Sequence, residues 1–291
     1  MNRGPEATRG MLLAVAAYGL WGFAPAYWKL LRAAPAGELL AQRVLWSLVV
    51  GALLIAITRR WSELAGVLRS RRQLLPILAS SLLIGLNWLI FIDAVNTGRV
   101  LATSLGYFLN PLVSVLLGVV FLGERLTRGQ QAAVAVGCAG VIVWAVNLGE
   151  APWIALSLAA SFGLYGLVRK VASVAPLVGF ALETLLLTPP ALAYLTSLSA
   201  QNAMTLPGSS LGVKALVAGS GVITAAPLLC FTSAARRLPL STLGFLQYLA
   251  PSISFLLAIG LYGEPFGRTQ AVAFSCVWAA LALFSLASRP R

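Results

Sequence analysis

The chain has 291 residues, of which 59% are hydrophobic and only 10% charged, and its mean hydropathy is +0.88. A soluble domain carries about a quarter charged residues, so this chain could not cover its surface in water. It has no histidine, and its three cysteines fall inside apolar runs, which disfavours a metal site, a cofactor and a disulfide. The net charge of +13 raises the question of a nucleic-acid partner, which the distribution of that charge disfavours.

Apolar runs of about 20 residues recur along the chain, and such a run crosses a bilayer as a helix. Because the runs are continuous rather than alternating, helices are favoured over a closed barrel. A cleaved signal peptide is the alternative for the first run, but its residues 18–22 (YGLWG) recur at 162–166 (FGLYG), which keeps it in the protein. The ten predicted spans are 11–31, 38–58, 74–96, 100–121, 129–147, 151–170, 176–196, 212–234, 240–261 and 267–287.

Lysine and arginine are distributed unequally between the two sides of these spans. Both termini and the connections after spans two, four, six and eight carry 15 of them, and the other connections carry five. The positive-inside rule then places both termini in the cytoplasm. We expect a multi-pass protein of the inner (plasma) membrane, with the lipid bilayer rather than nucleic acid beside its basic side.

Two stretches, 103–131 and 243–271, match at a constant offset of 140 residues. In each, a mid-span proline (Pro111 or Pro251) is followed twelve residues later by Gly-Glu, and then by Arg and Gln. The repeat predicts two halves of five spans each, 11–147 and 151–287. Since five is odd, the halves must be inverted in the membrane, as in secondary transporters. The predicted fold is therefore all-α, with ten transmembrane helices in two inverted repeats.

Aromatic and amide side chains recur at helical spacing inside the spans, where they could wall a cavity. Trp28 lies near the end of span one, where aromatic belts are ordinary. The deeper candidates are Tyr18 and Trp21 in span one, Asn87 and Trp88 in span three, and Phe162 and Tyr165 in span six.

Span four carries a polar stripe. The spacing of Thr103, Tyr107, Asn110 and Ser114 puts all four on one helical face. This face is predicted to line a substrate cavity; the alternative is hydrogen bonding between helices. The matching part of span nine offers Gln247 and, beside it, Tyr248.

Pro111 and Pro251 each remove a backbone donor in mid-span, which predicts a kink. Beside a cavity, the same two kinks could act as hinges.

Charged side chains inside spans are candidates for function. Arg43 could form a structural ion pair with Glu38 or Asp93. Glu183 lies on the order of 10 Å inside span seven and cannot reach water along lipid. It must therefore meet Arg43, another donor or the cavity, or take up a proton, which makes it the candidate for proton coupling.

Glu124 and Glu264 stand just before the next span in each half. A carboxylate there complements a helix dipole, so both are expected to be structural parts of the hairpins.

Several stretches carry a family resemblance. They include AY--WG at 17–22, SLGYF-NPL at 104–112, FLGER at 121–125, YGLVRK at 165–170 and STLGF at 241–245. The chain resembles the drug/metabolite transporter (DMT) superfamily of EamA type, above all RarD-like permeases, which are related to amino acid exporters of the YddG type. The resemblance implies a ten-helix inverted-repeat carrier with a central cavity. The chain departs from the family's pattern at Gln42 and Asp93.

The sequence as a whole predicts a monomeric secondary transporter rather than an enzyme. It would export small amphipathic metabolites, above all apolar or aromatic amino acids, by alternating access of the two halves. The alternatives are a drug exporter of the same fold, a membrane enzyme, and a scaffold that transports nothing. An enzyme would need convergent acid, base or metal ligands, and the lack of histidine and the scarcity of carboxylates argue against it.

Overall fold

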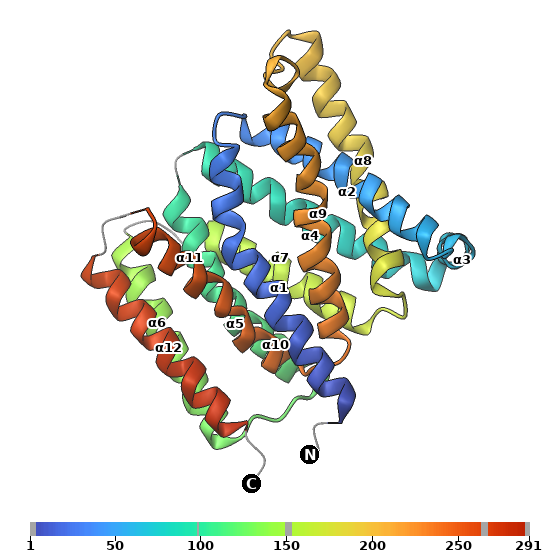
Figure 1. Ribbon diagram of the computed structural model, residues 1–291. Helices are drawn as coiled ribbons and strands as arrows, with labels where there is room; N and C mark the ends of the chain where they lie inside the picture. The colour runs from blue at the N-terminus through green and yellow to red at the C-terminus, as the bar shows by residue number, and fades with distance from the viewer. Residues whose placement is uncertain (1–3, 98, 149–152, 263–266, 289–291) are drawn as a thin grey trace.

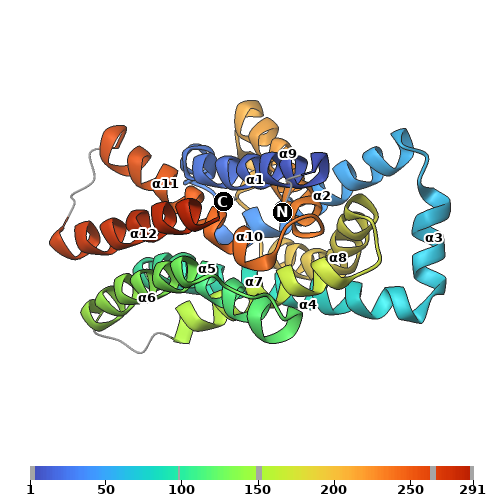
Figure 2. The same cartoon turned by 90° about the horizontal axis from the view of Figure 1, so that it is seen from below.

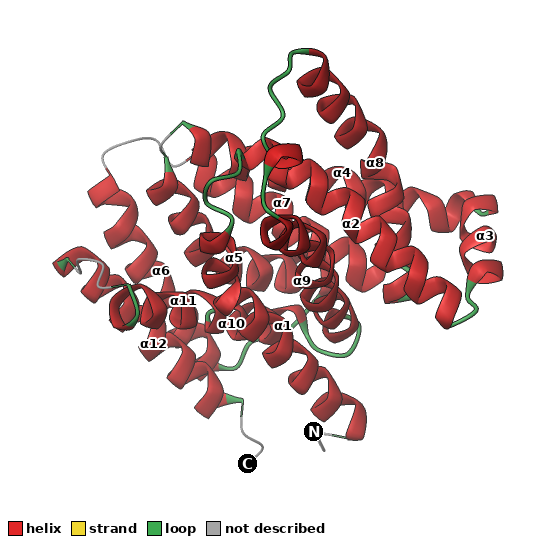
Figure 3. Cartoon of the chain, turned by 45° about the horizontal axis from the view of Figure 1, so that its top comes forward, coloured by secondary structure: helices red, strands yellow, loops and turns green. Residues whose placement is uncertain are grey.

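In the computed structural model, all residues are described except 1–3, 98, 149–152, 263–266 and 289–291. The described residues form helices and loops with no strand (Figure 3). The chain enters and leaves at one end of the bundle, which we call the terminal end (Figure 1). The opposite end, where α1 connects to α2, is called the distal end.

The helices follow the predicted spans closely. Nine stretches of the described residues are long and apolar enough to cross a membrane, and the shorter apolar run Ala271–Ala287 supplies a tenth. In order, the helices are α1 (Pro5–Leu30), α2 (Ala36–Ile57), α3 (Trp61–Arg69), α4 (Arg71–Asn96), α5 (Val100–Leu122), α6 (Arg128–Leu148), α7 (Trp153–Val171), α8 (Pro176–Ala200), α9 (Leu211–Ala235), α10 (Leu240–Gln247), α11 (Leu249–Gly260) and α12 (Arg268–Ala287).

Two short elements were not predicted. The nine-residue helix α3 joins α2 to α4 at the edge of the molecule (Figure 2), and a 3₁₀ turn, Leu206–Gly208, precedes α9. Arg60 pairs with Glu63 at 2.6 Å in the first turn of α3. A segment this short lies below the length of an apolar span, so a search for spans passes over it.

The two repeat-related prolines have different surroundings. Pro111 lies inside the continuous helix α5, whereas the ninth span is divided at Tyr248 into α10 and α11. Pro251 therefore falls in the first turn of α11, where a missing backbone N–H leaves no helical bond unmade. Gly244 of α10 packs closely on α5 at Pro111, since a Cβ at this glycine would lie 2.7 Å from the Pro111 carbonyl oxygen.

Helix packing joins the first half of the chain to the second. The main pairs are α1 with α9 and α11, α2 with α8 and α9, α4 and α5 with α7, α5 with α10, and α6 with α12. Figure 2 shows α6 and α12 side by side at the edge of the bundle opposite α3. Within the first half, the helices pack only lightly on one another.

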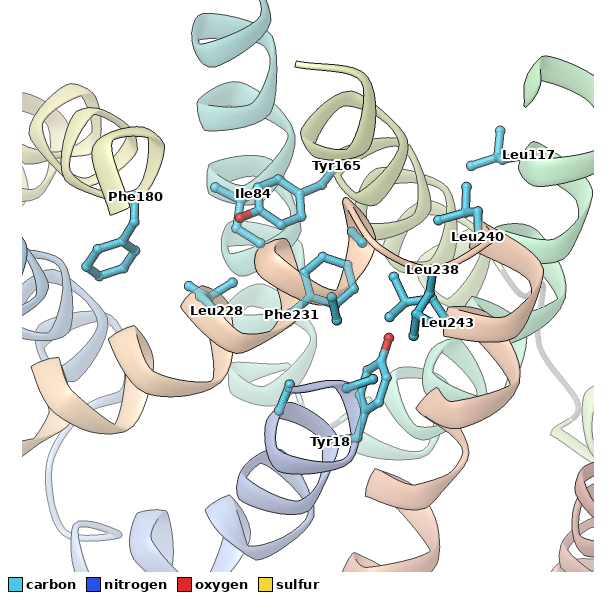
Figure 4. Packing of buried hydrophobic residues seen from close by; sticks show 14 of the residues in the cluster. Tyr18, Ile84, Leu117, Tyr165, Phe180, Leu228, Phe231, Leu238, Leu240 and Leu243 are labelled. Carbon is cyan, nitrogen blue, oxygen red and sulfur yellow. The ribbon is translucent and has the colours of Figure 1, made fainter. Parts of the chain in front are cut away.

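The largest apolar core lies toward the terminal end and draws on both halves. It is formed mainly by leucine, alanine and aromatic side chains from α1, α4, α5, α7, α8, α9 and α10 (Figure 4). Among them, Leu117, Leu240 and Leu243 bring α5 and α10 together. This core fills the centre of the bundle at the terminal end.

Candidate functional site

Five side chains from four helices gather in the distal half of the bundle, and we call them the distal cluster. They are Trp28 (α1), Arg43 (α2), Trp88 and Phe91 (α4), and Tyr107 (α5). The Arg43 guanidinium carbon lies 4.3 Å from the centre of the Trp88 ring and 5.6 Å from that of Trp28. The rings of Phe91 and Tyr107 are 6.3 Å apart. Arg43, Trp88 and Tyr107 each lie seven or eight residues from a helix end, about 10–12 Å below the distal end.

Arg43 and Tyr107 lie near each other. Their helices, α2 and α5, do not pack along each other, yet the two side chains are close enough to interact electrostatically. The Tyr107 side chain is 46% exposed, whereas its neighbours on α5 toward the helix centre are buried. The phenol, the guanidinium and the two indoles therefore lie together between four helices, and the phenol is exposed.

The structure does not bring Arg43 to either predicted ion-pair partner. The Glu38 carboxylate accepts hydrogen bonds from the Thr205 amide (3.0 Å), the Thr205 hydroxyl (2.8 Å) and the Leu206 amide (3.1 Å). Glu38 thus fixes the loop before α9, and Asp93 is exposed. None of the described carboxylates lies within ion-pair distance of Arg43. Its Nε is buried and has no hydrogen-bond partner among the described residues.

A second group of aromatic side chains lies nearer the middle of the bundle. Tyr18 and Trp21 of α1 and Phe162 and Tyr165 of α7 all contact Phe231 of α9, with ring centres 5.2–6.2 Å apart. Figure 4 shows Tyr18 and Tyr165 on opposite sides of Phe231. Tyr18 and Tyr165 are fully buried, and the Tyr18 hydroxyl has no hydrogen-bond partner among the described residues. The structure thus brings four predicted cavity residues together around Phe231, in a packed aromatic group between the halves that we call the plug.

The predicted polar stripe of α5 is divided by burial. Thr103, Asn110 and Ser114 are buried, at 2–5% exposure, and Tyr107 alone is open. Ser114 packs on Gly244 of α10, in the contact between the halves. The Asn110 side-chain oxygen is buried and has no hydrogen-bond partner among the described residues. Asn110 lies one turn from Tyr107 on the same face.

Three further predicted residues lie in contacts between helices. The Asn87 amide donates to the Leu158 carbonyl and the Ser161 hydroxyl of α7, both at 2.9 Å. Gln247 is buried at the end of α10. The Tyr248 hydroxyl donates to the Phe108 carbonyl at 3.3 Å, within the core formed by α5, α6, α10 and α12.

Glu183 lies in the terminal half, far along the bundle axis from Arg43. Its carboxylate is 3.4 Å from Arg169 Nε, and it accepts hydrogen bonds from the Ser80 hydroxyl (2.5 Å) and the Tyr165 hydroxyl (3.3 Å). Arg169 is 1% exposed, and Gly179 leaves room for it, since a Cβ there would overlap the guanidinium. Of the partners considered from sequence, the carboxylate therefore meets another donor, Arg169.

Glu124 has a structural role, but not the one expected. Its carboxylate accepts from the Leu240 amide (2.5 Å), the Ser241 amide (2.8 Å) and the Ser241 hydroxyl (2.6 Å). It therefore caps α10 in the other half rather than the start of α6, and it fixes α5 to α10 at the terminal end. Its repeat mate Glu264 lies outside the described residues.

Sequence reasoning missed several residues of these groups. Phe231 is the only aromatic residue of span eight, and it stands at the centre of the plug. Arg169 lies four residues after Tyr165, so the two share a helical face, a spacing that could have revealed it. Trp28 fitted an interfacial belt, and its contact with Arg43 depends on helix packing that spacing alone does not contain. Among the described residues, no group of three or more His, Cys, Asp or Glu side chains could hold a metal ion.

Over the described residues, long apolar helices that bury aromatic rings and amides between them define a multi-pass membrane protein. The model of the EamA-like transporter family matches residues 8–146. An uncharacterized transporter of Vibrio cholerae is 47% identical over 97% of this chain and 93% of its own length. Protein RarD of Escherichia coli strain K12 is 45% identical over 96% and 94% of the two chains. The chain therefore belongs to the EamA-like transporter family of the DMT superfamily, and it is a membrane transporter.

Two more distant similarities agree with this assignment. Chloramphenicol-sensitive protein RarD of Pseudomonas aeruginosa is 36% identical over 94% of this chain and 93% of its own. One solved crystal structure, described only as that of a protein, superposes with a TM-score of 0.73 at 21% identity. It covers 97% of this chain and 99% of its own, and at this identity it shows the fold alone.

Proposed function

We propose that this transporter exports small amphipathic metabolites, above all amino acids with apolar or aromatic side chains, by alternating access of two inverted halves. It acts as a monomer in the inner membrane with both termini in the cytoplasm. The observation that carries the substrate class is the distal cluster, where aromatic rings surround a few polar groups and the Tyr107 side chain is exposed. Apolar walls with a small number of placed polar groups are typical of small-molecule sites.

The two ends of the bundle support alternating access. At the terminal end, the leucine core and the three bonds of Glu124 hold α5 against α10. In the distal half, Tyr107 is open beside Arg43. We take this arrangement as the state closed toward the termini, and the region of Pro111 in α5 and the division at Tyr248 before Pro251 as the hinges of the transition.

Export of drug-like molecules is the second candidate. It is favoured by the name of the Pseudomonas aeruginosa relative, which refers to chloramphenicol sensitivity. Chloramphenicol also combines an aromatic ring with polar groups, so the same walls could accept it.

A flux screen in proteoliposomes tests both candidates. Purified protein is reconstituted, and labelled phenylalanine, leucine, lysine and chloramphenicol are followed with and without a pH gradient. Faster flux of phenylalanine and leucine than of lysine is expected, relative to protein-free vesicles. Flux of chloramphenicol alone would favour the second candidate, and flux of none of the four would contradict both.

Reporter fusions test the orientation. A reporter fused after Arg291 and one inserted in the 197–211 loop should lie on opposite sides of the membrane, the first in the cytoplasm. If both report the same side, the ten-span arrangement is wrong.

A further inference from the structure

We propose that Arg43, with Trp28, Trp88 and Tyr107 around it, binds a carboxylate group of the substrate, and that the substrates are monoanions or zwitterions with an apolar or aromatic body. This inference deepens the proposed function, on which it depends for the transport step only. Carboxylate binding itself can be measured without transport.

The argument begins with the cost of the charge. An arginine side chain stays protonated at any physiological pH, and a charge within a membrane span is expensive unless it is paired. Arg43 has no carboxylate within 4 Å among the described residues, and its Nε is without a hydrogen-bond partner. The two indoles attract the cation but offer it no hydrogen-bond acceptor. Among the described residues, Arg43 thus has no carboxylate to balance its charge and no acceptor for its Nε–H.

The geometry around Arg43 suits a ligand rather than a missing protein partner. The guanidinium lies against the Trp88 and Trp28 rings and near the exposed Tyr107 side chain. Its planar arrangement of N–H donors matches the two oxygens of a carboxylate, and the Tyr107 hydroxyl can donate a further hydrogen bond. Trp88, Phe91 and Trp28 provide flat apolar surfaces next to the charge.

The charge of the cluster selects among anions. One cation balances one negative charge, and the cluster contains no second Lys or Arg, so a carboxylate fits better than a doubly charged phosphate. A zwitterion also needs an acceptor for its ammonium group. The unpartnered side-chain oxygen of Asn110, one turn from Tyr107, is the acceptor that the described residues offer on that face.

The test uses matched probes and detergent-purified full-length protein. Binding of 3-phenylpropionate, 3-phenylpropanamide and L-phenylalanine is measured by competition or by isothermal titration. The first two probes share a body and differ only in the carboxylate. The parent protein is expected to bind the propionate at least about 10-fold more tightly than the amide, the effect of one hydrogen bond to a charged group.

Three variants locate that preference. Arg43→Gln should remove the preference for the propionate. Arg43→Lys should keep part of this preference, because a lysine retains the charge without the planar donors. Tyr107→Phe should weaken the preference less than either Arg43 variant does. The matched control is Lys29→Gln. Lys29 is another distal cation on an aromatic ring, 3.2 Å from the centre of Tyr262, and it lies outside the cluster. The control should keep the full preference.

The melting temperature of each variant shows whether a loss of binding results from misfolding. Removing an unpaired cation leaves no carboxylate stranded, so Arg43→Gln should melt at the same temperature as the parent or higher. If Arg43→Gln unfolds, the test relies on the binding measured for Arg43→Lys and Tyr107→Phe. An unchanged preference for the propionate in both of these variants overturns the proposal.

The outcomes separate this inference from the proposed function. If the parent has no preference for the propionate, or if Arg43→Gln retains it, the carboxylate site is overturned even if phenylalanine is transported. If the preference is present and depends on Arg43 but no amino acid is transported, the carboxylate site is supported and the proposed function fails.

Discussion

Two arginines inside the bundle, Arg169 and Arg43, differ in how their charge is balanced. Arg169, in the terminal half, is 3.4 Å from the Glu183 carboxylate and donates to the Pro176 carbonyl at 3.4 Å. Arg43, in the distal half, meets two indole rings and no described carboxylate. A paired charge buried in protein holds helices together, whereas an unpaired charge remains available to a ligand. Arg169 is therefore expected to stabilise the folded protein, and Arg43 to recognise the substrate.

The largest expected effect is on stability at Arg169. Arg169→Met should lower the free energy of unfolding by about 3–5 kcal/mol, because it leaves the Glu183 carboxylate buried without its cation. Denaturant unfolding of the detergent-purified variant measures this. The double variant Arg169→Met with Glu183→Leu should recover much of the loss, and Arg43→Met should lose far less. Equal losses at Arg169 and Arg43 would contradict the comparison.

A smaller effect is expected for Glu183→Gln. The amide keeps the volume and can still accept from Ser80, but it no longer neutralises Arg169, so a loss of about 2 kcal/mol is expected. The variant also tests the proton-coupling role predicted from sequence. If Glu183 carries the coupled proton, the pH profile of transport flattens in the variant. A profile identical to that of the parent removes that role and leaves the ion pair a structural one.

Next comes the contact between the halves at Glu124. Glu124→Ala removes three hydrogen bonds at the start of α10, and a loss of about 1–2 kcal/mol is expected, as for other helix caps. If the terminal end opens as proposed, these three bonds must break, so their loss should raise the rate of opening toward the termini. Accessibility of a cysteine placed at Ser241 to a thiol reagent measures that opening, in a background without native cysteines. Unchanged accessibility would argue that the leucine core alone closes this end.

The smallest effect is expected at Asn110. Asn110→Leu removes the unpartnered amide at similar size, so the melting temperature should change little. If the amide meets substrate, affinity should fall by a factor of roughly 5–10, equivalent to about 1 kcal/mol. A binding curve and a melt on the same preparation separate the two roles. A lowered melting temperature with unchanged affinity would make Asn110 a packing residue.

The sequence predicted the spans well because length and hydropathy are local properties. Its ten ranges agree with the helices to within a few residues, except for the extended amino-terminal end of α1 and the division at Tyr248. That division was missed because Pro251 and Pro111 look alike in sequence, and their difference depends on the packing around each helix. Candidate residues were found where they share a helical face, as Tyr18 and Trp21 do. Contacts such as Trp28 with Arg43, or Glu124 with Ser241, join residues far apart in sequence, and no spacing rule contains them.

The pairing of helices across the halves also has a consequence for how the protein is made. During synthesis, α1 to α6 enter the membrane before their main neighbours α7 to α12 exist, and they pack only lightly on one another. Until α7 arrives, the inward faces of α4 and α5 have only lipid or the insertion machinery beside them, and Arg43 is already in the membrane. The first half must therefore persist as a loosely associated set of helices. Its assembly waits on completion of the chain, so truncated products should be targets of membrane quality control rather than stable half-transporters.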